Sequence, residues 1–467
     1  MVCGTILGTL VGGQSTIGTA QLAFCYGISA WWFTIGAALG ALVLAAVYAK
    51  PIRHSGCTTL LEIVAKAYGR KAETIGSSLF LIGIFISIMA QVLSSSAMMT
   101  SLLGIPLAWS ATISAILIAL FVLFGGIHSA GIGGIIKLVL LYIGCTTAGI
   151  MVLLFDNGIA GTYSNIERIF ALPTLRDANG LSSIESIHDR YGNILARGVM
   201  KDIGGCISLM LGVVTTQTYA QGIWSGATTE KARRGGLYCA ILIPIIGAAC
   251  TLVGLYMRGH YITASELATL QSAGTPPPNN AGVIPSSLEA FPAFVLNHMP
   301  PWLGGIALGA MFVNIMGCGS GLSLGAATIV VRDIIPTMSD KTKIRPKGIF
   351  TSQLTQTRIT IAAILALAAV SVLSVKGSFI NDLGFLSLGL RAVALLFPLS
   401  FALFLPQHFK QQAITHAMII GTAVMLAAQV LALPGAPVYY GLFASLLVIL
   451  IPNFLPFRKE KSDKREQ

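Results

Sequence analysis

Twelve apolar stretches, each about long enough to cross a bilayer, recur along this chain and limit the folds open to it. Lipid offers the backbone no hydrogen bonds, so segments of this kind have to form membrane-spanning helices. With 55% hydrophobic and only 10% charged residues, the composition is that of a membrane protein rather than a soluble one. We therefore predict an all-α polytopic membrane protein with about 12 transmembrane helices, at residues 4–28, 29–49, 73–104, 107–125, 134–155, 201–224, 235–257, 302–331, 357–375, 379–405, 413–433 and 436–454.

The basic residues predict the orientation of these helices. Of 29 Lys and Arg residues, 20 lie in one alternating set of connections that includes the C-terminal tail, and 7 lie in the other set. Basic residues accumulate on the cytoplasmic side of a membrane, so both termini are predicted to be cytoplasmic. The net charge of +12 therefore indicates contact with the lipid bilayer rather than with nucleic acid.

Two of the predicted spans carry polar residues at mid-length, where an ordinary span is apolar. They are GTILGTLVGGQSTIGTAQLAFCYG (4–27) and DIGGCISLMLGVVTTQTYAQGIW (202–224). Irregular backbone at membrane depth is tolerated only where it lines a cavity or is buried in protein. Interrupted helices at corresponding places in two halves indicate an inverted-repeat transporter, with spans one and six broken in two five-helix halves.

This pattern predicts the following organisation. A short amphipathic stretch near 58–69 lies before the third span, and a second one at Phe291–Asn297 returns toward the membrane. The predicted units are a first five-helix repeat at 1–155, an extracellular loop at 156–200, a second five-helix repeat at 201–405 with an extracellular loop at 258–300, two additional C-terminal helices at 406–454, and a cytoplasmic tail at 455–467.

Nothing in the sequence indicates an enzyme. The eight cysteines form no CxxC pair and lie mostly in apolar segments, where a thiol packs as a small hydrophobic group. The chain has no HExxH, GxSxG or phosphate-binding GxxxxGK[ST] motif, and its histidines show no metal-ligand spacing. We expect no catalytic residue, no cofactor and no metal centre beyond a site for a coupling ion.

Six segments in order make the chain resemble the sodium/solute symporter family. They are GGQSTIGTAQLAFCYGISAWW (12–32), the third span with Gln91, GGIHSAGIGGIIK (125–137), TQTYAQGIWSGATTEKARRGG (216–236), LNHMPPWLGGIALGAMF (296–312) and AATIVVRDI (326–334). The resemblance implies a LeuT-type fold with a five-plus-five inverted repeat. The family normally has a further span before the first broken helix, whereas Met1 lies almost at that helix here, so either this branch lost the span or the start of the sequence is truncated.

The resemblance implies a secondary active transporter in the cell inner (cytoplasmic) membrane. Spans 1, 2, 6 and 7 would rock against the others and carry a small polar solute by alternating access. A Na⁺ gradient would drive transport, with H⁺ as a second candidate. Two alternatives remain open, an ion-independent carrier and a transporter-like sensor that binds its ligand without transport. The sequence leaves the solute and the oligomeric state undetermined.

Polar residues at mid-span are the candidates for binding the solute. Ser and Thr also allow helices to pack closely, so each hydroxyl has that structural alternative. Arg391 either binds an anionic group or has a structural partner, Asp382 or the C-terminal carbonyls of a helix, because a charge at this depth needs a cavity or a partner. The predicted solute-binding residues are Gln14, Ser15, Gln91, Ser95, Thr216, Gln217, Tyr219 and Arg391.

The ion site implied by the resemblance is altered in this chain. Its carbonyl ligands map to Gly8 and Val11, and its hydroxyl ligands map to Gly317 and Cys318, which offer no hard oxygen. An acidic position of the family maps to Gly134, and Lys137 follows one turn later. Lys137 either supplies a positive charge at the site or extends to the cytoplasmic interface. A register shift that brings Ser320 into place would restore one oxygen.

Overall fold

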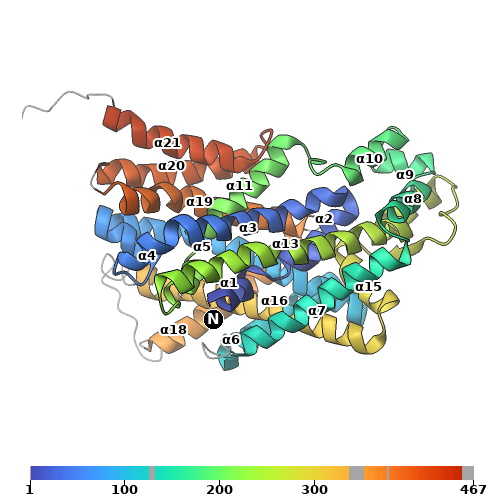
Figure 1. Cartoon of the computed structure of the whole chain (residues 1–467), viewed down its shortest axis with the longest axis horizontal. Helices are drawn as coiled ribbons and strands as arrows, with labels where there is room; N and C mark the ends of the chain where they lie inside the picture. Colours follow the sequence, from blue (N-terminus) through green and yellow to red (C-terminus); the bar gives the residue numbers. More distant parts are fainter. Residues whose placement is uncertain (1, 126–131, 336–351, 376–377, 407, 455–467) are drawn as a thin grey trace, which may run out of the picture.

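The structure, a computed structural model, describes residues 2–125, 132–335, 352–375, 378–406 and 408–454. Long helices run side by side along the long axis of the molecule, and the short helices α8 to α10 gather at one end (Figure 1). The described residues hold eight helices long and apolar enough to cross a membrane, and a ninth if a bent pair is counted as one span. The predicted all-helical membrane fold is confirmed, whereas the count of 12 spans is not.

The first half of the chain begins with a broken helix, and the first long connection follows the end of this half. Glycine at position 27 has a φ of 61°, so the chain turns there between the first broken helix and α3. The elements are α1 (Val2–Leu10), η1 (Gln14–Gly18), α2 (Thr19–Tyr26), η2 (Gly27–Trp31), α3 (Trp32–Val43), η3 (Leu44–Tyr48), α4 (Ala49–His54), α5 (Leu60–Leu103), α6 (Leu107–Gly125), α7 (Ile132–Phe155), α8 (Ile159–Ile169), α9 (Pro173–Ala178) and α10 (Ile184–Gly192).

The second half opens with a broken helix of its own. Its halves meet at Thr216 with a bend of 51°. The elements are α11 (Val199–Thr215), α12 (Gln217–Trp224), α13 (Thr229–His260), β1 (Tyr261–Thr263), α14 (Ala264–Ser272), β2 (Gly282–Ile284), η5 (Ser287–Glu289), α15 (Ala290–His298), α16 (Pro301–Ile329), η6 (Val330–Ile334), α18 (Gln353–Ser374), α19 (Ile380–Phe404), α20 (Gln411–Val430) and α21 (Pro437–Phe454). The short strands β1 and β2 pair in parallel.

Helix packing repeats between the two halves. Helix α3 packs on α11 as α13 packs on α2, and α5 packs on α19 as α16 packs on α7. If each of the first five spans is exchanged with its counterpart in the second five, the α3–α11 contact becomes the α13–α2 contact. The α5–α19 contact likewise becomes the α16–α7 contact. This is the contact pattern of a five-plus-five repeat, and it places both breaks near the centre of the bundle.

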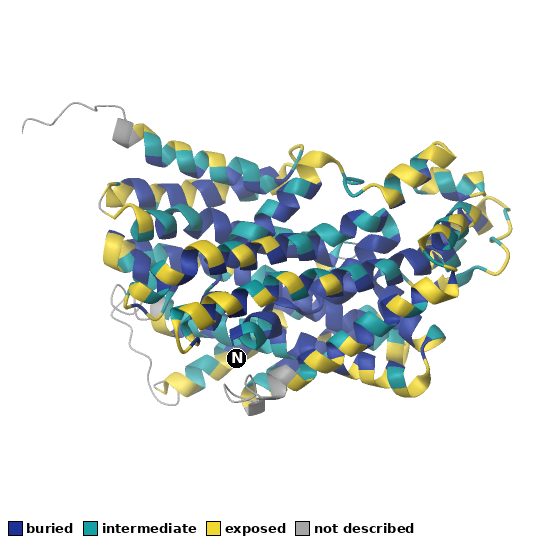
Figure 2. Ribbon diagram, viewed as in Figure 1, coloured by how far each residue is buried: buried dark blue, intermediate teal, exposed yellow. Residues whose placement is uncertain are grey.

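Burial follows the same plan. Buried residues fill the middle of the bundle, and exposed residues mark its outer faces and the end with the short helices (Figure 2). Many exposed side chains on the long helices are large and apolar, among them Leu154, Ile241 and Val370. Apolar side chains on the outside are expected where the surrounding solvent is lipid. All eight cysteines are free thiols, and six of them are buried.

Both amphipathic stretches fold as helices. Residues 60–68 form the first turns of α5, and Gly69, with a φ of 78°, separates them from the membrane-spanning part. Glycine tolerates this backbone conformation because it has no Cβ. The second stretch forms α15, which packs on α2, α5, α13 and α16. The predicted loop at 156–200 holds α8 to α10, which share a small hydrophobic cluster around Phe170 and Tyr191 with residues of α13, β1 and α14.

Candidate functional site

The first break in the helix ladder lies between α1 and η1, at residues 11–13. Two glycines allow this segment to approach its neighbours closely. A Cβ at Gly13 would collide with Ser94 of α5, and a Cβ at Gly12 would lie 3.0 Å from the Cys318 sulfur of α16. The backbone N–H of Gly13 donates to Oε1 of Gln91 over 3.1 Å. The break is therefore held between α5 and α16, with Gln91 supplying the acceptor that the interrupted helix lacks.

A polar stripe on α5 runs past this break. Ser87, Gln91 and Ser95 are buried and follow one another at four-residue intervals, so they share one helix face. The hydroxyl of Ser95 and Nε2 of Gln14 are buried without a hydrogen-bond partner among the described residues. Unsatisfied buried polar atoms are costly, and they mark positions where a ligand or water would be stabilised.

The second break places a hydroxyl against the guanidinium of Arg391. The side chain of Thr216 donates to the carbonyl of Gly212 over 2.6 Å and accepts a hydrogen bond from Nη1 of Arg391 over 3.2 Å. Arg391 also donates from Nε to the carbonyl of Ser387, and from Nη2 to the hydroxyls of Ser387 and Ser87 at 2.5 Å each. All these acceptors are neutral oxygens.

Arg391 is 1% exposed and has no carboxylate partner among the residues that the structure describes. The alternative that it pairs with Asp382 is wrong, because Asp382 forms an ion pair with Arg197. The ring of Phe80 lies 5.7 Å from the Arg391 guanidinium carbon. The core of the bundle thus contains a positive charge whose described partners are neutral, next to the second break.

Three further residues predicted to bind the solute, Gln217, Ser15 and Tyr219, contact other parts of the protein. Gln217 accepts from the backbone N–H of Leu60 over 2.8 Å and donates to the carbonyl of Thr58 over 3.3 Å, so it joins α12 to the start of α5. The Ser15 hydroxyl donates to the carbonyl of Leu10 across the first break. Tyr219 is buried in α12 and interacts electrostatically with Arg391. The structure thus groups Gln14, Ser15, Gln91 and Ser95 around the first break, and Thr216, Tyr219 and Arg391 around the second.

The segment predicted to hold the ion lies where α1, α7 and α16 meet. The sulfur of Cys318 lies 3.4 Å from the carbonyl oxygen of Gly8 and 3.6 Å from that of Val11, and its single S–H donates to one of them, with Gly8 the nearer. The side-chain amide of Asn314 also donates to the Val11 carbonyl. Ser320 instead donates to the carbonyl of Gly317 over 2.9 Å. The two carbonyls that would bind a cation therefore already accept hydrogen bonds from the protein.

Lys137 extends into this junction rather than to the surface. A Cβ at Gly317 would collide with its Nζ. Sodium is a hard cation that needs several oxygen ligands, and a thiol and a nearby ammonium group supply neither oxygen nor negative charge. These residues do not fit a sodium ion. Gly134, where the family has an acidic residue, lies in α7 and supplies no carboxylate.

Two residues with clear roles at these sites were not singled out from the sequence. Ser87 lies one turn before Gln91, and Asn314 lies one turn before Cys318, so helical periodicity could have identified both. Their roles depend on partners in other helices. Sequence spacing alone does not provide those partners.

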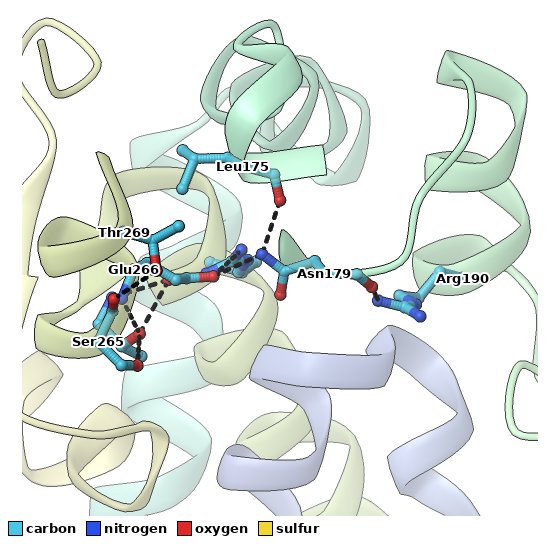
Figure 3. Close-up of polar contacts among 8 residues, drawn as sticks. Leu175, Asn179, Arg190, Ser265, Glu266 and Thr269 are labelled. Atoms are coloured by element: carbon cyan, nitrogen blue, oxygen red, sulfur yellow. Dashed lines mark hydrogen bonds and ion pairs between the residues drawn. The ribbon is translucent and has the colours of Figure 1, made fainter. Parts of the chain in front are cut away.

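A second polar cluster lies in the connections at the end of the bundle that carries α8 to α10 (Figure 3). Arg258 at the end of α13 donates two hydrogen bonds to Glu266 of α14, of 2.9 and 2.7 Å. Asn179 donates to the same carboxylate, and Arg190 donates to the Asn179 carbonyl. Burial opposes ionisation of Glu266, but Arg258 and these hydrogen bonds lower its pKa to about 2. The carboxylate thus fastens α14 to α13 and to the segment after α9.

Comparison with known proteins gives one family for most of the chain. The model of the family described as "Sodium:solute symporter family" matches residues 1–421. Among curated proteins, the high-affinity choline transporter 1 of Torpedo marmorata is 24% identical over 337 residues, which are 71% of this chain and 53% of the relative. The sodium/glucose cotransporter of Vibrio parahaemolyticus is 21% identical, over 66% of this chain and 57% of that protein. The chain thus spans about half the length of these curated relatives.

A solved structure supports the fold. A Na⁺-coupled sialic acid symporter in a substrate-bound outward-open state aligns with 96% of this chain and 87% of its own, with a TM-score of 0.64 and 15% identity. At this identity the likeness concerns the fold alone.

Proposed function

Because the chain belongs to the sodium:solute symporter family, we propose that it is a secondary active transporter of a small polar solute. The solute would bind between the two breaks, and the helices around the site would alternate its access to the two sides of the membrane. A cation gradient, of Na⁺ or H⁺, would drive uptake. We place the protein in the cytoplasmic membrane with both termini inside, as the distribution of basic residues favours.

We further propose that the solute carries a negative charge, and the environment of Arg391 is the observation that supports this. Burying an unpaired charge costs free energy, and this cost remains until a group of opposite charge binds next to it. Among the described residues, Arg391 has only neutral acceptors and an aromatic ring around it. A carboxylate would complete the pairing through the fork-like geometry of the guanidinium group.

The other candidate residues would contact the rest of the solute. Gln14 and Ser95 each keep a buried polar atom without a partner among the described residues, so each has a free hydrogen-bonding group. Thr216 and Tyr219 lie beside Arg391. The choline transporters carry a quaternary ammonium ion, which a buried guanidinium would repel.

Uptake into proteoliposomes tests this function directly. Lactate and lactamide have nearly the same size but differ in charge, and glucose, choline and sialic acid represent the relatives' solutes. We expect uptake of at least one carboxylate, and at least a tenfold loss in Arg391→Gln with the melting temperature retained. Arg53→Gln serves as the control, since Arg53 donates only to backbone carbonyls at the end of α12 and beyond it. Its loss should lower stability without changing the preference for carboxylates.

Two results would contradict the proposal. If Arg391→Gln transports lactamide, glucose or choline as well as the unmodified protein does, the proposal of an anionic solute is wrong. A carboxylate that raises the melting temperature but never enters the vesicles would favour the sensor alternative.

A further inference from the structure

We propose that the ammonium group of Lys137 is the resident cation at the junction of α1, α7 and α16, and that this protein binds no Na⁺ there. Lys137 would then supply the cation of the transporter proposed above, and only this role in transport rests on the proposed function. The contacts between residues at the junction support the absence of Na⁺ there.

The junction is built to hold a positive charge. Helix α1 ends at Leu10, and the carbonyls of Gly8, Thr9 and Val11 lie at this C-terminal end. The C-terminal end of a helix carries a partial negative charge and stabilises a cation close to it. A group of carbonyls without a metal therefore still favours an ammonium group nearby.

Lys137 reaches this place because residue 317 is a glycine. Among the residues that the structure describes, the only atoms within 4 Å of a Cβ built at Gly317, beyond its own helix and chain neighbours, are Nζ and Cε of Lys137. A serine or threonine hydroxyl at position 317 would therefore need the space that the ammonium group takes. Glycine at 317 and lysine at 137 are complementary, and together they exchange a hydroxyl for a tethered charge.

The remaining ligands are also accounted for. The Cys318 sulfur lies 3.4 to 3.6 Å from the carbonyls of Gly8, Thr9 and Val11, and its one proton is donated to one of them, while the Asn314 amide donates to Val11. A sodium ion would have to displace these donors, gain no hydroxyl in return, and approach an ammonium group of the same charge. The hydrogen-bonded carbonyls, the missing hydroxyls and the ammonium group thus each oppose the binding of Na⁺.

The melting temperature of the full-length protein in detergent tests the inference without any transport assay. The probes are NaCl, KCl and choline chloride at equal ionic strength. A cation that binds only the folded protein stabilises it by mass action. For the unmodified protein we expect the same melting temperature in all three salts. A saturable, Na⁺-specific rise would overturn the inference.

A set of variants tests the mechanism. In Lys137→Ala/Gly317→Ser/Cys318→Ser, the charge is removed and two hydroxyls are introduced, so we expect NaCl to raise the melting temperature by roughly 2 °C or more over KCl. The matched control Gly317→Ser/Cys318→Ser retains the charge of Lys137, whose flexible ammonium end has to shift away from the serine Cβ but stays tethered at the junction, and it should show no Na⁺ response. A Na⁺ response in this control equal to that of the triple variant would show that the charge does not exclude the ion.

Uptake separates this inference from the proposed function. If both hold, carboxylate uptake persists when choline replaces Na⁺ outside the vesicles. If no solute is transported, the proposed function fails, while the melting temperatures still decide whether Na⁺ binds. Lys50→Met, which removes an exposed lysine of α4, controls for the general loss of a positive charge.

Discussion

Arg197, just before α11, forms an ion pair with Asp382 near the start of α19. The arginine side chain is 3% exposed and the aspartate side chain 35%. The pair connects the broken helix of the second half to the helix that carries Arg391. Backbone contacts support it, because the N–H of Arg197 also donates to Asp202 in α11. It is therefore a cross-link between two helices that would have to shift against each other if the transporter rocks as proposed.

The Arg197–Asp382 pair should show measurable coupling in a double-mutant cycle. We expect Arg197→Met and Asp382→Asn to be coupled by about 1 kcal/mol in unfolding free energy, since the partly exposed carboxylate is screened by solvent. The exposed Arg234–Glu230 pair in α13 provides the control and should give a coupling near zero. Equal coupling for the two pairs would mean that burial of Arg197 adds nothing.

Glu266 should make stability sensitive to acid. Its pKa in the folded protein is about 2, below the ordinary value of 4.5. Stability from the ionised carboxylate is therefore present above pH 4.5 and is lost as the pH falls toward 2. We expect the unfolding free energy of the unmodified protein to fall by about 3 kcal/mol more than that of Glu266→Gln between pH 5 and pH 2. Parallel pH profiles for the two proteins would contradict this.

Ser95 and Gln91 should respond differently to substitution although they lie one turn apart on α5. The Ser95 hydroxyl has no hydrogen-bond partner among the described residues, so Ser95→Ala should leave the melting temperature unchanged or higher. Gln91→Leu removes the acceptor of the Gly13 N–H and should lower stability by about 1 to 3 kcal/mol. Thermal unfolding of both variants checks this, and a larger loss for Ser95→Ala would show that its hydroxyl is structurally paired.

The close approach at the first break should be rescued by a compensating change. Gly13→Ala places a Cβ against the Ser94 side chain, so we expect it to lower the melting temperature. In Gly13→Ala/Ser94→Gly the colliding atoms are removed, and stability should return toward that of Ser94→Gly alone. If the double variant is as unstable as the sum of the two single variants, the collision is not what requires glycine at position 13.

Several elements could be predicted from the sequence because their causes are local. The breaks at residues 11–13 and at Thr216 occur where Gly, Ser, Thr and Gln interrupt apolar runs. Most of the amphipathic stretch at 58–69 forms the first turns of α5, because Thr59 caps the helix before Leu60 and Gly69 interrupts it with a positive φ. The number of spans proved harder to predict, since helices such as α6 and α21 are short and the boundaries of broken helices are not fixed by hydropathy.

The sequence by itself determined that this chain is a helical membrane protein with two interrupted spans, because apolar length and the need to satisfy backbone hydrogen bonds are properties of each segment. Only the tertiary structure decided the partners of the charges. Asp382 pairs with Arg197, Arg391 is left with neutral oxygens, and Lys137 meets Gly317. Each of these outcomes depends on how helices far apart in sequence are rotated and packed. That arrangement is set by the sum of many side-chain contacts across the bundle, rather than by any one segment.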